Sequence, residues 1–252
     1  MSKPKRLLGS FVASFTPKCS FDRAIFVIGH MRCGSTALSH ILCSRPDISG
    51  YGEAHIAYTS EADLGVLALN QRRRGAWKSE ANYIFDKILH SRYDGDPPAA
   101  FFSARAIFVA RAPGPTIASI RNLFCKIGSE EYQQTGDAET YYAERLTAMM
   151  CLWERFPPEN CIGLSYEDLI EDPDATLGRV SRHLRINPPL ANNYSASLAA
   201  SGRGAGDPLV AGQQTTIVKL DRHVTPSAEK SDDVSSEIVG IHERFLRCCK
   251  VE

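Results

Sequence analysis

The sequence lacks several patterns that would assign it to a common class of protein. Its 29 Lys and Arg residues balance 29 Asp and Glu residues, so no overall field attracts a nucleic-acid backbone or an anionic membrane. The eight cysteines form no C-x-x-C pair and no His/Cys spacing suited to zinc, which predicts buried thiols in a reducing compartment. No stretch approaches ~20 uninterrupted apolar residues, so no membrane-spanning helix is predicted. We therefore expect a cytoplasmic protein that binds anions only locally.

The first 23 residues differ in pattern from the rest of the chain. They hold basic residues and an apolar patch broken by Ser, Thr and Pro17, which is too short for a signal peptide. We expect an N-terminal arm over residues 1–23. Residues 24–252 have a length that α/β folds fill as a single domain.

Short apolar runs alternate with helical patterns along this domain. Strands are predicted at 24–28, 83–89, 106–110 and 161–164, and helices at 35–43, 61–77, 113–128, 138–156, 173–184 and 232–249. The alternation predicts a P-loop-type parallel sheet flanked by helices, a three-layer α/β/α fold with ligands at the carboxyl ends of the strands. The loop at 187–216 is long enough to be a functional lid.

The segment after the first predicted strand is nearly a phosphate-binding loop. "AIFVIGHMRCGSTALSHIL", residues 24–42, fits G-x-x-x-x-G-K-[ST] except that Ser35 replaces the lysine. Gly29 and Gly34 let backbone N–H groups curve around an anion, and the following helix directs its positive end at it. A tight turn with a capped helix would leave the same pattern, so the loop alone does not decide between the two readings.

The cation of this loop is Arg32, and no apolar strand ends in an aspartate that could hold magnesium. A metal-dependent kinase is therefore disfavoured, since such enzymes neutralise the γ-phosphoryl group with a lysine and Mg²⁺. A sulfuryl group carries less charge and can be transferred without a metal.

Five motifs occur in a family-like order: "MRCGSTAL", "ISGYGE", "DK", "IFVARAPGPTIASI" and "LSYEDLIEDP". Together they span most of residues 24–184 and resemble the sulfotransferase family that uses 3′-phosphoadenosine 5′-phosphosulfate (PAPS), particularly its bacterial members. The resemblance implies that the chain is an enzyme that moves a sulfuryl group from PAPS to a hydroxyl acceptor, an amine being less favoured. It implies no metal and leaves adenosine 3′,5′-bisphosphate as product.

The resemblance also implies which residues bind the donor. The 5′-phosphosulfate is expected to bind to the loop residues Arg32, Gly34, Ser35 and Thr36, with Cys33 in place of a family serine. The 3′-phosphate is expected to bind to Arg111 and Ser119. Tyr166 matches a tyrosine near the adenine, and Arg203 lies in a Gly-rich stretch that lacks the family's Arg-Lys-Gly order. His30 and Met31 replace the usual pair that ends in proline.

The acceptor hydroxyl needs a base to take its proton. Glu53 matches the family's glutamate, while His55 and His90 are rivals that the sequence does not separate. Lys87 is expected to stabilise the oxygen that departs from the sulfuryl group, with Asp86 orienting it.

Two other functions stay open: an ATP/Mg-dependent kinase or NTPase, and a non-catalytic nucleotide-binding module. The acceptor is expected to be a small molecule, and carrier-bound molecules, lipids and sugars are all compatible with the sequence. Neither oligomeric state nor acceptor identity follows from these patterns.

Overall fold

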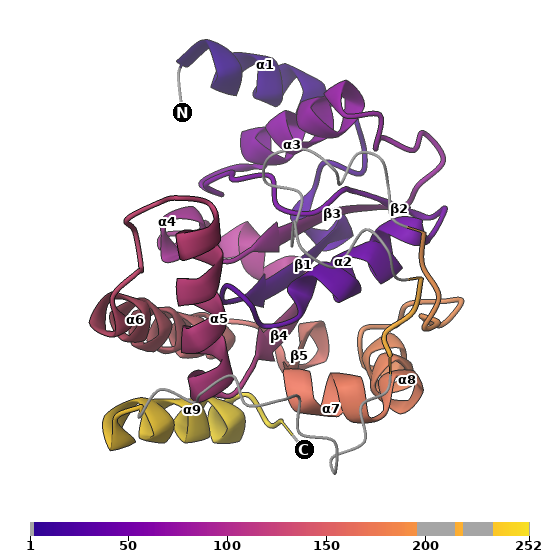
Figure 1. Ribbon diagram of the computed structural model, residues 1–252. Helices are drawn as coiled ribbons and strands as arrows, with labels where there is room; N and C mark the ends of the chain where they lie inside the picture. The colour runs from indigo at the N-terminus through magenta and orange to yellow at the C-terminus, as the bar shows by residue number, and fades with distance from the viewer. Residues whose placement is uncertain (1–2, 196–214, 219–233, 252) are drawn as a thin grey trace.

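A five-stranded parallel sheet forms the centre of the protein in the computed structural model, which describes residues 3–195, 215–218 and 234–251 (Figure 1). The strands lie in the order β2-β3-β1-β4-β5. Their bounds are β1 Ala24–Gly29, β2 Ile48–Ser49, β3 Tyr83–Ile88, β4 Arg105–Ala110 and β5 Cys161–Ser165. Four of them coincide with the predicted strands. The fold class predicted from the sequence, a parallel sheet between helices, is confirmed.

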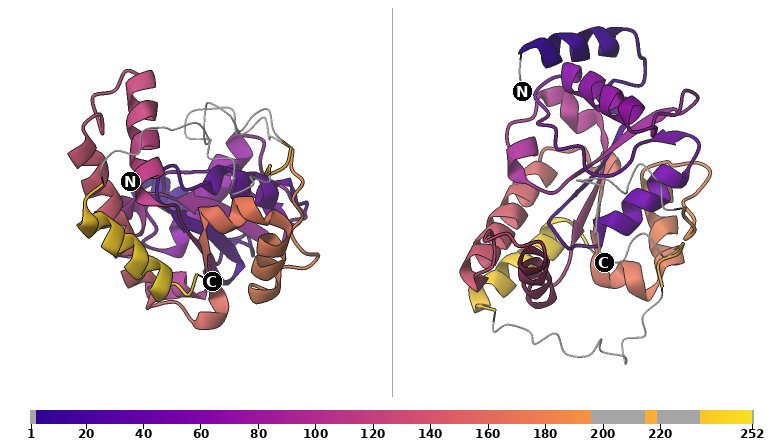
Figure 2. Two further views of the ribbon diagram at one scale, coloured as in Figure 1. Left: turned by 60° about the horizontal axis from the view of Figure 1, so that its bottom comes forward. Right: turned by 45° about the horizontal axis from the view of Figure 1, so that its top comes forward.

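Helices cover both faces of this sheet (Figures 1 and 2). Successive side chains of β1 point to opposite faces of the sheet: Ile25 and Val27 belong to one apolar cluster, and Phe26 and Ile28 belong to another. Because both faces are apolar, each needs a layer of helices. The first cluster is completed by α2 (Ser35–Ser44), α7 (Tyr166–Glu171) and α8 (Pro173–His183). The second is completed by α3 (Glu61–Arg73), α5 (Pro113–Lys126), α6 (Thr135–Trp153) and α9 (Ser236–Cys248). The remaining described elements are α1 (Lys3–Ser14), α4 (Ser91–Asp94) and the short 3₁₀ turns η1 (Phe21–Arg23), η2 (Ala99–Ser103) and η3 (Pro158–Asn160).

The strand order places a topological switch point between β1 and β4. The chain leaves β1 toward β2 on one side of the sheet, and it leaves β4 toward β5 on the other. Loops that diverge in this way open a crevice at the carboxyl ends of the two strands, where α/β proteins bind ligands. By this rule the expected ligand site, called the crevice below, lies between the loop that carries Arg32 and the strand end that carries Arg111.

Residues 3–14, expected to belong to an arm, form helix α1, which packs against α3 (Figure 1). The two helices approach closely because glycines meet at their contact: a Cβ built on Gly65 would lie 1.9 Å from the carbonyl oxygen of Gly9. In the part of the chain that the structure describes, no helix is both long and apolar enough to cross a membrane.

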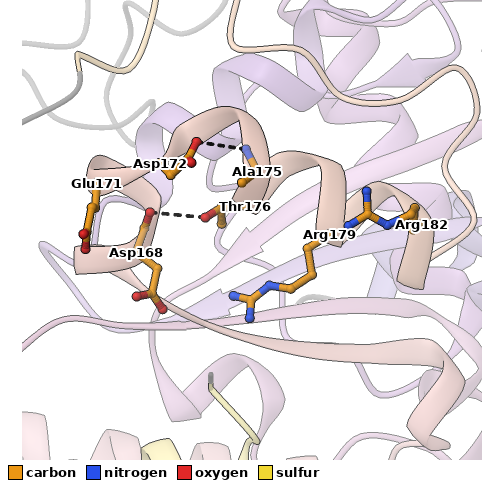
Figure 3. A pocket seen from close by; sticks show the side chains of 7 residues that line it. All are labelled: Asp168, Glu171, Asp172, Ala175, Thr176, Arg179 and Arg182. Carbon is orange, nitrogen blue, oxygen red and sulfur yellow. Dashed lines mark hydrogen bonds between the residues drawn. The ribbon is translucent and has the colours of Figure 1, made fainter.

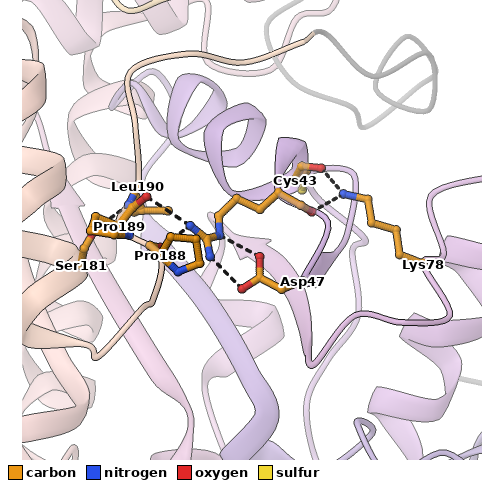
Figure 4. Close-up of polar contacts among 8 residues, drawn as sticks. Cys43, Asp47, Lys78, Ser181, Pro188, Pro189 and Leu190 are labelled. Atoms are coloured by element: carbon orange, nitrogen blue, oxygen red, sulfur yellow. Dashed lines mark hydrogen bonds and ion pairs between the residues drawn. The ribbon is translucent and has the colours of Figure 1, made fainter.

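A network around Arg45, the residue that follows α2, lies at the amino end of β2, away from the carboxyl ends of the strands (Figure 4). Its guanidinium pairs with both carboxylate oxygens of Asp47 at 2.8 Å and donates to the carbonyls of Pro188 and Pro189. Lys78 donates to the carbonyl oxygens of Cys43 and Arg45. These contacts belong to the edge away from the crevice, so we assign them a structural role.

Candidate active site

The β1–α2 loop has the backbone shape of an anion-binding turn. Arg32 and Gly34 both adopt left-handed conformations, with φ of 66° and 82°. Gly34 is the N-cap of α2, and no side chain of the described residues caps this helix. The first-turn N–H groups of a helix lack intrahelical acceptors, so the start of α2, at Ser35 and Thr36, offers donors and a positive dipole end to an anion.

Arg32 reaches across the crevice to helix α5. Its Nε donates a hydrogen bond to Oγ of Ser119 at 2.9 Å, between residues 87 positions apart in the sequence. The first loop motif and the second family motif therefore meet in space.

Arg111 and Tyr166 bring the ends of β4 and β5 to the same loop. The guanidinium carbon of Arg111 lies 4.6 Å from the centroid of the Tyr166 ring, a cation–π contact. The same ring lies against Gly34, where an added Cβ would come within 2.4 Å of Tyr166 Cδ2. The structure thus gathers Arg32, Ser119, Arg111 and Tyr166 around one loop, as the sequence predicted.

His30 links the end of β1 to the end of β4, a role that the sequence did not suggest. Its Nε2 accepts a hydrogen bond from the backbone N–H of Arg111 at 3.0 Å, so its Nδ1 carries the proton and donates to the carbonyl of Met31 at 2.8 Å. Burial lowers the pKa of His30 to about 3, against the Met31 contact, which raises it. A neutral imidazole therefore joins the end of β1 to the end of β4.

Helix α6 braces the same strand ends with three side chains, Tyr141, Tyr142 and Arg145. The hydroxyl of Tyr141 accepts from the N–H of Met31 and donates to the carbonyl of Leu89, both at 2.8 Å. Tyr142 donates to the carbonyl of Arg111 at 2.8 Å.

Arg145 completes the brace one turn later. It is 1% exposed and donates to the carbonyls of Gly29 and Ile88, at 2.8 Å and 3.1 Å. Its two terminal nitrogens pair with both oxygens of the buried Asp94 at 2.7 Å and 2.8 Å. Bidentate pairing satisfies a charge that would otherwise be costly at this depth. A buried Arg in an otherwise apolar helical stripe was the available clue to this brace.

Glu53 lies in the segment after β2 and is 8% exposed. Burial raises the pKa of this carboxyl, opposed chiefly by the positive charge of Lys87 and then that of His55. Its Oε1 is buried and accepts no hydrogen bond from any described residue, although Nε2 of His55 is 3.4 Å away. A buried carboxylate with a raised pKa and an unsatisfied oxygen has the properties of a general base.

Lys87 and Asp86, at the end of β3, lie beside this carboxyl. Lys87 is 2% exposed, and burial lowers its pKa against the attraction of Glu53. Asp86 accepts hydrogen bonds from Tyr58 Oη at 2.6 Å and from the N–H groups of Ala54 and Lys87 at 2.8 Å. Asp86 therefore holds the residue next to Glu53 as well as the backbone of Lys87.

The two histidine rivals share one aromatic neighbour. The rings of His55 and His90 lie 5.6 Å and 6.2 Å from the ring of Tyr93. Burial lowers the pKa of His90 to about 4, while the His55 side chain is 43% exposed. Nε2 of His55 lies 3.4 Å from Oε1 of Glu53, and His90 is linked to this pair through the ring of Tyr93.

Two predicted binding residues stand apart from this description. The Cys33 side chain is fully buried, and burial raises the pKa of its thiol. Its backbone N–H donates to the carbonyl of His30 at 3.4 Å, and the residue belongs to the apolar cluster that contains Ile25. Arg203 lies outside the described residues.

A separate cavity of about 440 Å³ lies between α7 and α8 (Figure 3). Most of the side chains that line it are acidic or basic. Two lining residues make hydrogen bonds within the helices themselves: Asp172 accepts from the N–H of Ala175, and Thr176 donates to the carbonyl of Asp168. None of the predicted site residues lines it. Among the described residues, no cluster of three or more His, Cys, Asp or Glu side chains is arranged to hold a metal ion.

The chain is similar to known proteins in sequence and in fold. Residues 74–189 match a family model described as "Sulfotransferase family". The sulfotransferase domain from the curacin biosynthetic pathway is 18% identical, with a TM-score of 0.60 over 90% of this chain and 97% of that one. The resemblance to the sulfotransferase family is confirmed.

Two further sulfotransferase structures share the fold. The domain from the Synechococcus PCC 7002 olefin synthase is 17% identical, with a TM-score of 0.61 over 88% of this chain and 93% of that one. The enzyme from Alicyclobacillus acidocaldarius is 14% identical, with a TM-score of 0.53 over 90% and 93%. No curated protein sequence matches the chain significantly.

The residues matched by the family model, 74–189, include some of the predicted site residues and omit others. Lys87, Arg111, Ser119 and Tyr166 fall within residues 74–189, whereas Arg32 and Glu53 precede them. The contacts of Arg32 with Ser119 and of Gly34 with Tyr166 attach the preceding segments to the matched core.

Proposed function

We propose that the protein is a PAPS-dependent sulfotransferase that transfers a sulfuryl group to a hydroxyl acceptor without a metal ion. The observation that carries the proposal is the hydrogen bond from Arg32 to Ser119, beside Arg111 on the ring of Tyr166. It brings cationic groups from two distant motifs to one crevice, as a donor with anions at both ends requires.

The residues of the crevice fit such a nucleotide. The open N-terminus of α2 suits the 5′-phosphosulfate, and Arg111 with Ser119 suits the 3′-phosphate. Gly34 allows the Tyr166 ring to lie against the loop, because a Cβ at this position would come within 2.4 Å of Tyr166 Cδ2, and an aromatic ring at this place suits a purine. When bound, PAPS supplies the activated sulfuryl group.

The chain's own residues then divide the remaining work. Glu53 would take the acceptor proton, because burial raises the pKa of its carboxyl toward that of a useful base and its Oε1 is free to accept a hydrogen bond from an incoming hydroxyl. Lys87, whose pKa is lowered by burial against the attraction of Glu53, would stabilise negative charge on the leaving oxygen.

Asp86 and the α6 brace would keep these groups in place. Asp86 fixes the backbone at Ala54, next to the base, while Tyr141, Tyr142 and Arg145 fix the strand ends that carry Lys87 and Arg111. Such preorganisation lowers the cost of aligning donor and acceptor. We extend the proposal to a small hydroxyl acceptor, carrier-bound, lipid or sugar, and to a cytoplasmic location.

The experiment is a comparison of ligands followed by a transfer assay. Adenosine 3′,5′-bisphosphate should raise the melting temperature, since a ligand at 100 times its Kd adds about 2.7 kcal/mol of apparent stability. ATP with Mg²⁺ should not. A response to ATP with Mg²⁺ alone would instead favour a kinase or NTPase.

The transfer assay separates an enzyme from a binding module. With ³⁵S-labelled PAPS and a panel of phenols, sterols, sugars and carrier-bound hydroxy acids, label should move to an acceptor in the presence of EDTA. Binding of the bisphosphate with no transfer to any class, and no hydrolysis of PAPS, would indicate a non-catalytic module.

A further inference from the structure

Helix α1 exposes an apolar stripe to solvent. Its members are large side chains spaced by one helical turn, with exposed fractions of 74% for Leu7, 47% for Leu8, 64% for Phe11 and 74% for Phe15. The rings of Phe11 and Phe15 lie 4.9 Å apart. Of the seven exposed large apolar side chains in the described part of the chain, these four belong to one nine-residue segment. Single exposed apolar residues are common, whereas a contiguous group marks a contact surface.

The stripe is not the packing face of the helix. The opposite face, with Gly9 and Val12, lies on α3, where the glycine contact brings the two backbones together. Arg6 adds a hydrogen bond to Oγ1 of Thr59 at the start of α3. The helix is therefore attached to the domain with its apolar stripe pointing outward, at the outer edge of the molecule (Figures 1 and 2).

The segment that carries the stripe holds charged residues of one sign only. Residues 1–18 contain Lys3, Lys5, Arg6 and Lys18 and no Asp or Glu, against 25 basic and 29 acidic residues in the rest of the chain. At the far end of α1, Lys18 and the exposed Arg72 both lie on the ring of Trp77, at 4.2 Å and 4.6 Å. The basic run 72–74, which the active-site proposal does not use, thus begins beside this segment.

We propose that α1 docks the protein on an anionic lipid bilayer, with Leu7, Leu8, Phe11 and Phe15 entering the interface. An apolar helix face on a segment whose charged residues are all basic is the pattern of an interfacial helix. A convex helix also needs no complementary groove in a bilayer. Pairing with a second copy along this stripe would bring like charges together, which disfavours a dimer.

The test is co-sedimentation of the full chain with vesicles of phosphatidylcholine alone or with 30% phosphatidylglycerol. The protein should bind the anionic vesicles, and raising the salt concentration should weaken binding. The double variant Leu7→Ser, Phe11→Ser should bind at least tenfold more weakly, estimated from ~1.5–3 kcal/mol for each large apolar side chain. Ile127→Ser, which removes a 57%-exposed apolar side chain from another surface, should bind as the wild type does.

Charge and fold have their own controls. Lys5→Glu should weaken binding about fivefold or more, and Arg244→Glu on α9 should not. Melting temperature and the shift induced by adenosine 3′,5′-bisphosphate should be unchanged in every variant, because no altered side chain touches the crevice. No wild-type binding to anionic vesicles, equal binding of the double variant, or conversion of a wild-type dimer to a monomer by that variant would each overturn the proposal.

Discussion

Oε1 of Glu53 lies 3.4 Å from Nε2 of His55, and the two side chains differ sharply in exposure, 10% against 43%. Burial raises the pKa of the Glu53 carboxyl, so its carboxylate takes up a proton more readily than an exposed carboxylate does. The exposed imidazole can serve as its partner without being the base.

Glu53→Gln should therefore lower kcat by about 10²–10⁴-fold, the usual contribution of a general base. His55→Gln should lower it much less. Both should bind adenosine 3′,5′-bisphosphate normally, measured by calorimetry, because neither touches Arg32 or Arg111. Equal losses in the two variants would argue for His55 as base.

Arg111→Ala should weaken binding of adenosine 3′,5′-bisphosphate by at least ~tenfold, since a hydrogen bond to a charged group contributes about 1.5–3 kcal/mol. Ser119→Ala should have a smaller effect, because it also frees Arg32. The control is Arg105→Ala at the opposite end of the same strand, where Arg105 donates to the carbonyl of Leu184. If Arg105→Ala weakened binding equally, the crevice would not be the nucleotide site.

Gly34→Ala should abolish nucleotide binding and destabilise the fold. The new Cβ would meet Tyr166 at 2.4 Å and would also strain a residue at φ 82°. Gly128→Ala is the matched control, because Gly128 has φ of 68° with nothing within 4 Å. It should cost only the backbone strain of ~1–2 kcal/mol. Urea unfolding and calorimetry measure both effects, and identical behaviour of the two variants would contradict the packing argument.

Asp86 should make stability depend on pH. Burial raises its pKa to about 7 in spite of three hydrogen bonds that favour the carboxylate. The folded protein then holds a proton that the unfolded chain, with a pKa near the ordinary 3.8, releases. This contribution is complete below about pH 4 and is lost as pH rises toward 7, with a slope near 1.4 kcal/mol per unit.

The variant Asp86→Asn should remove this dependence. The difference in unfolding free energy between wild type and variant should therefore change between pH 4 and 7 and be flat above it. His30, whose pKa is lowered to about 3, acts in the opposite direction on both proteins and cancels in the difference. A constant difference across the range would show that Asp86 keeps an ordinary pKa.

Iodoacetamide should label Cys125 and Cys151, the exposed thiols, and leave Cys33 unmodified in the folded protein. The buried thiol with a raised pKa is both inaccessible and un-ionised. Turnover should therefore persist after labelling, with peptide mapping by mass spectrometry to identify the sites. Loss of activity that tracks labelling of Cys33 would mean that the thiol reaches the crevice.

The sequence predicted the sheet because its strands are nearly continuous apolar runs between helical patterns. It missed β2, which has only two residues, and α1, whose large apolar side chains lie on the outward face and give no core-facing pattern. The sequence pattern predicted that this helix ends at residue 77, whereas α3 ends at Arg73. The helix stops earlier because Gly75 takes a left-handed conformation, with φ of 67°.

Local motifs were enough to select Arg32 and Ser119, which the structure brings into hydrogen-bond contact. Their binding of an anion stays a prediction. The supporting contacts could not be predicted in this way. Tyr141 and Arg145 bond to partners 110 and 116 positions earlier, and His30 bonds to one 81 positions later. Such pairs become neighbours only through the strand order, which single-sequence patterns do not specify.

The brace formed by Tyr141, Tyr142 and Arg145 has a consequence for how a protein with the proposed function could diverge. These side chains hold the strand end that carries Lys87 and the strand end before Arg111. A change of one methylene or one hydroxyl in α6 would alter the spacing of these strand ends and leave Lys87 and Arg111 in place. Under the proposed function, substitutions in α6 would therefore retune the preference for longer or bulkier acceptors without replacing any residue proposed to bind the donor.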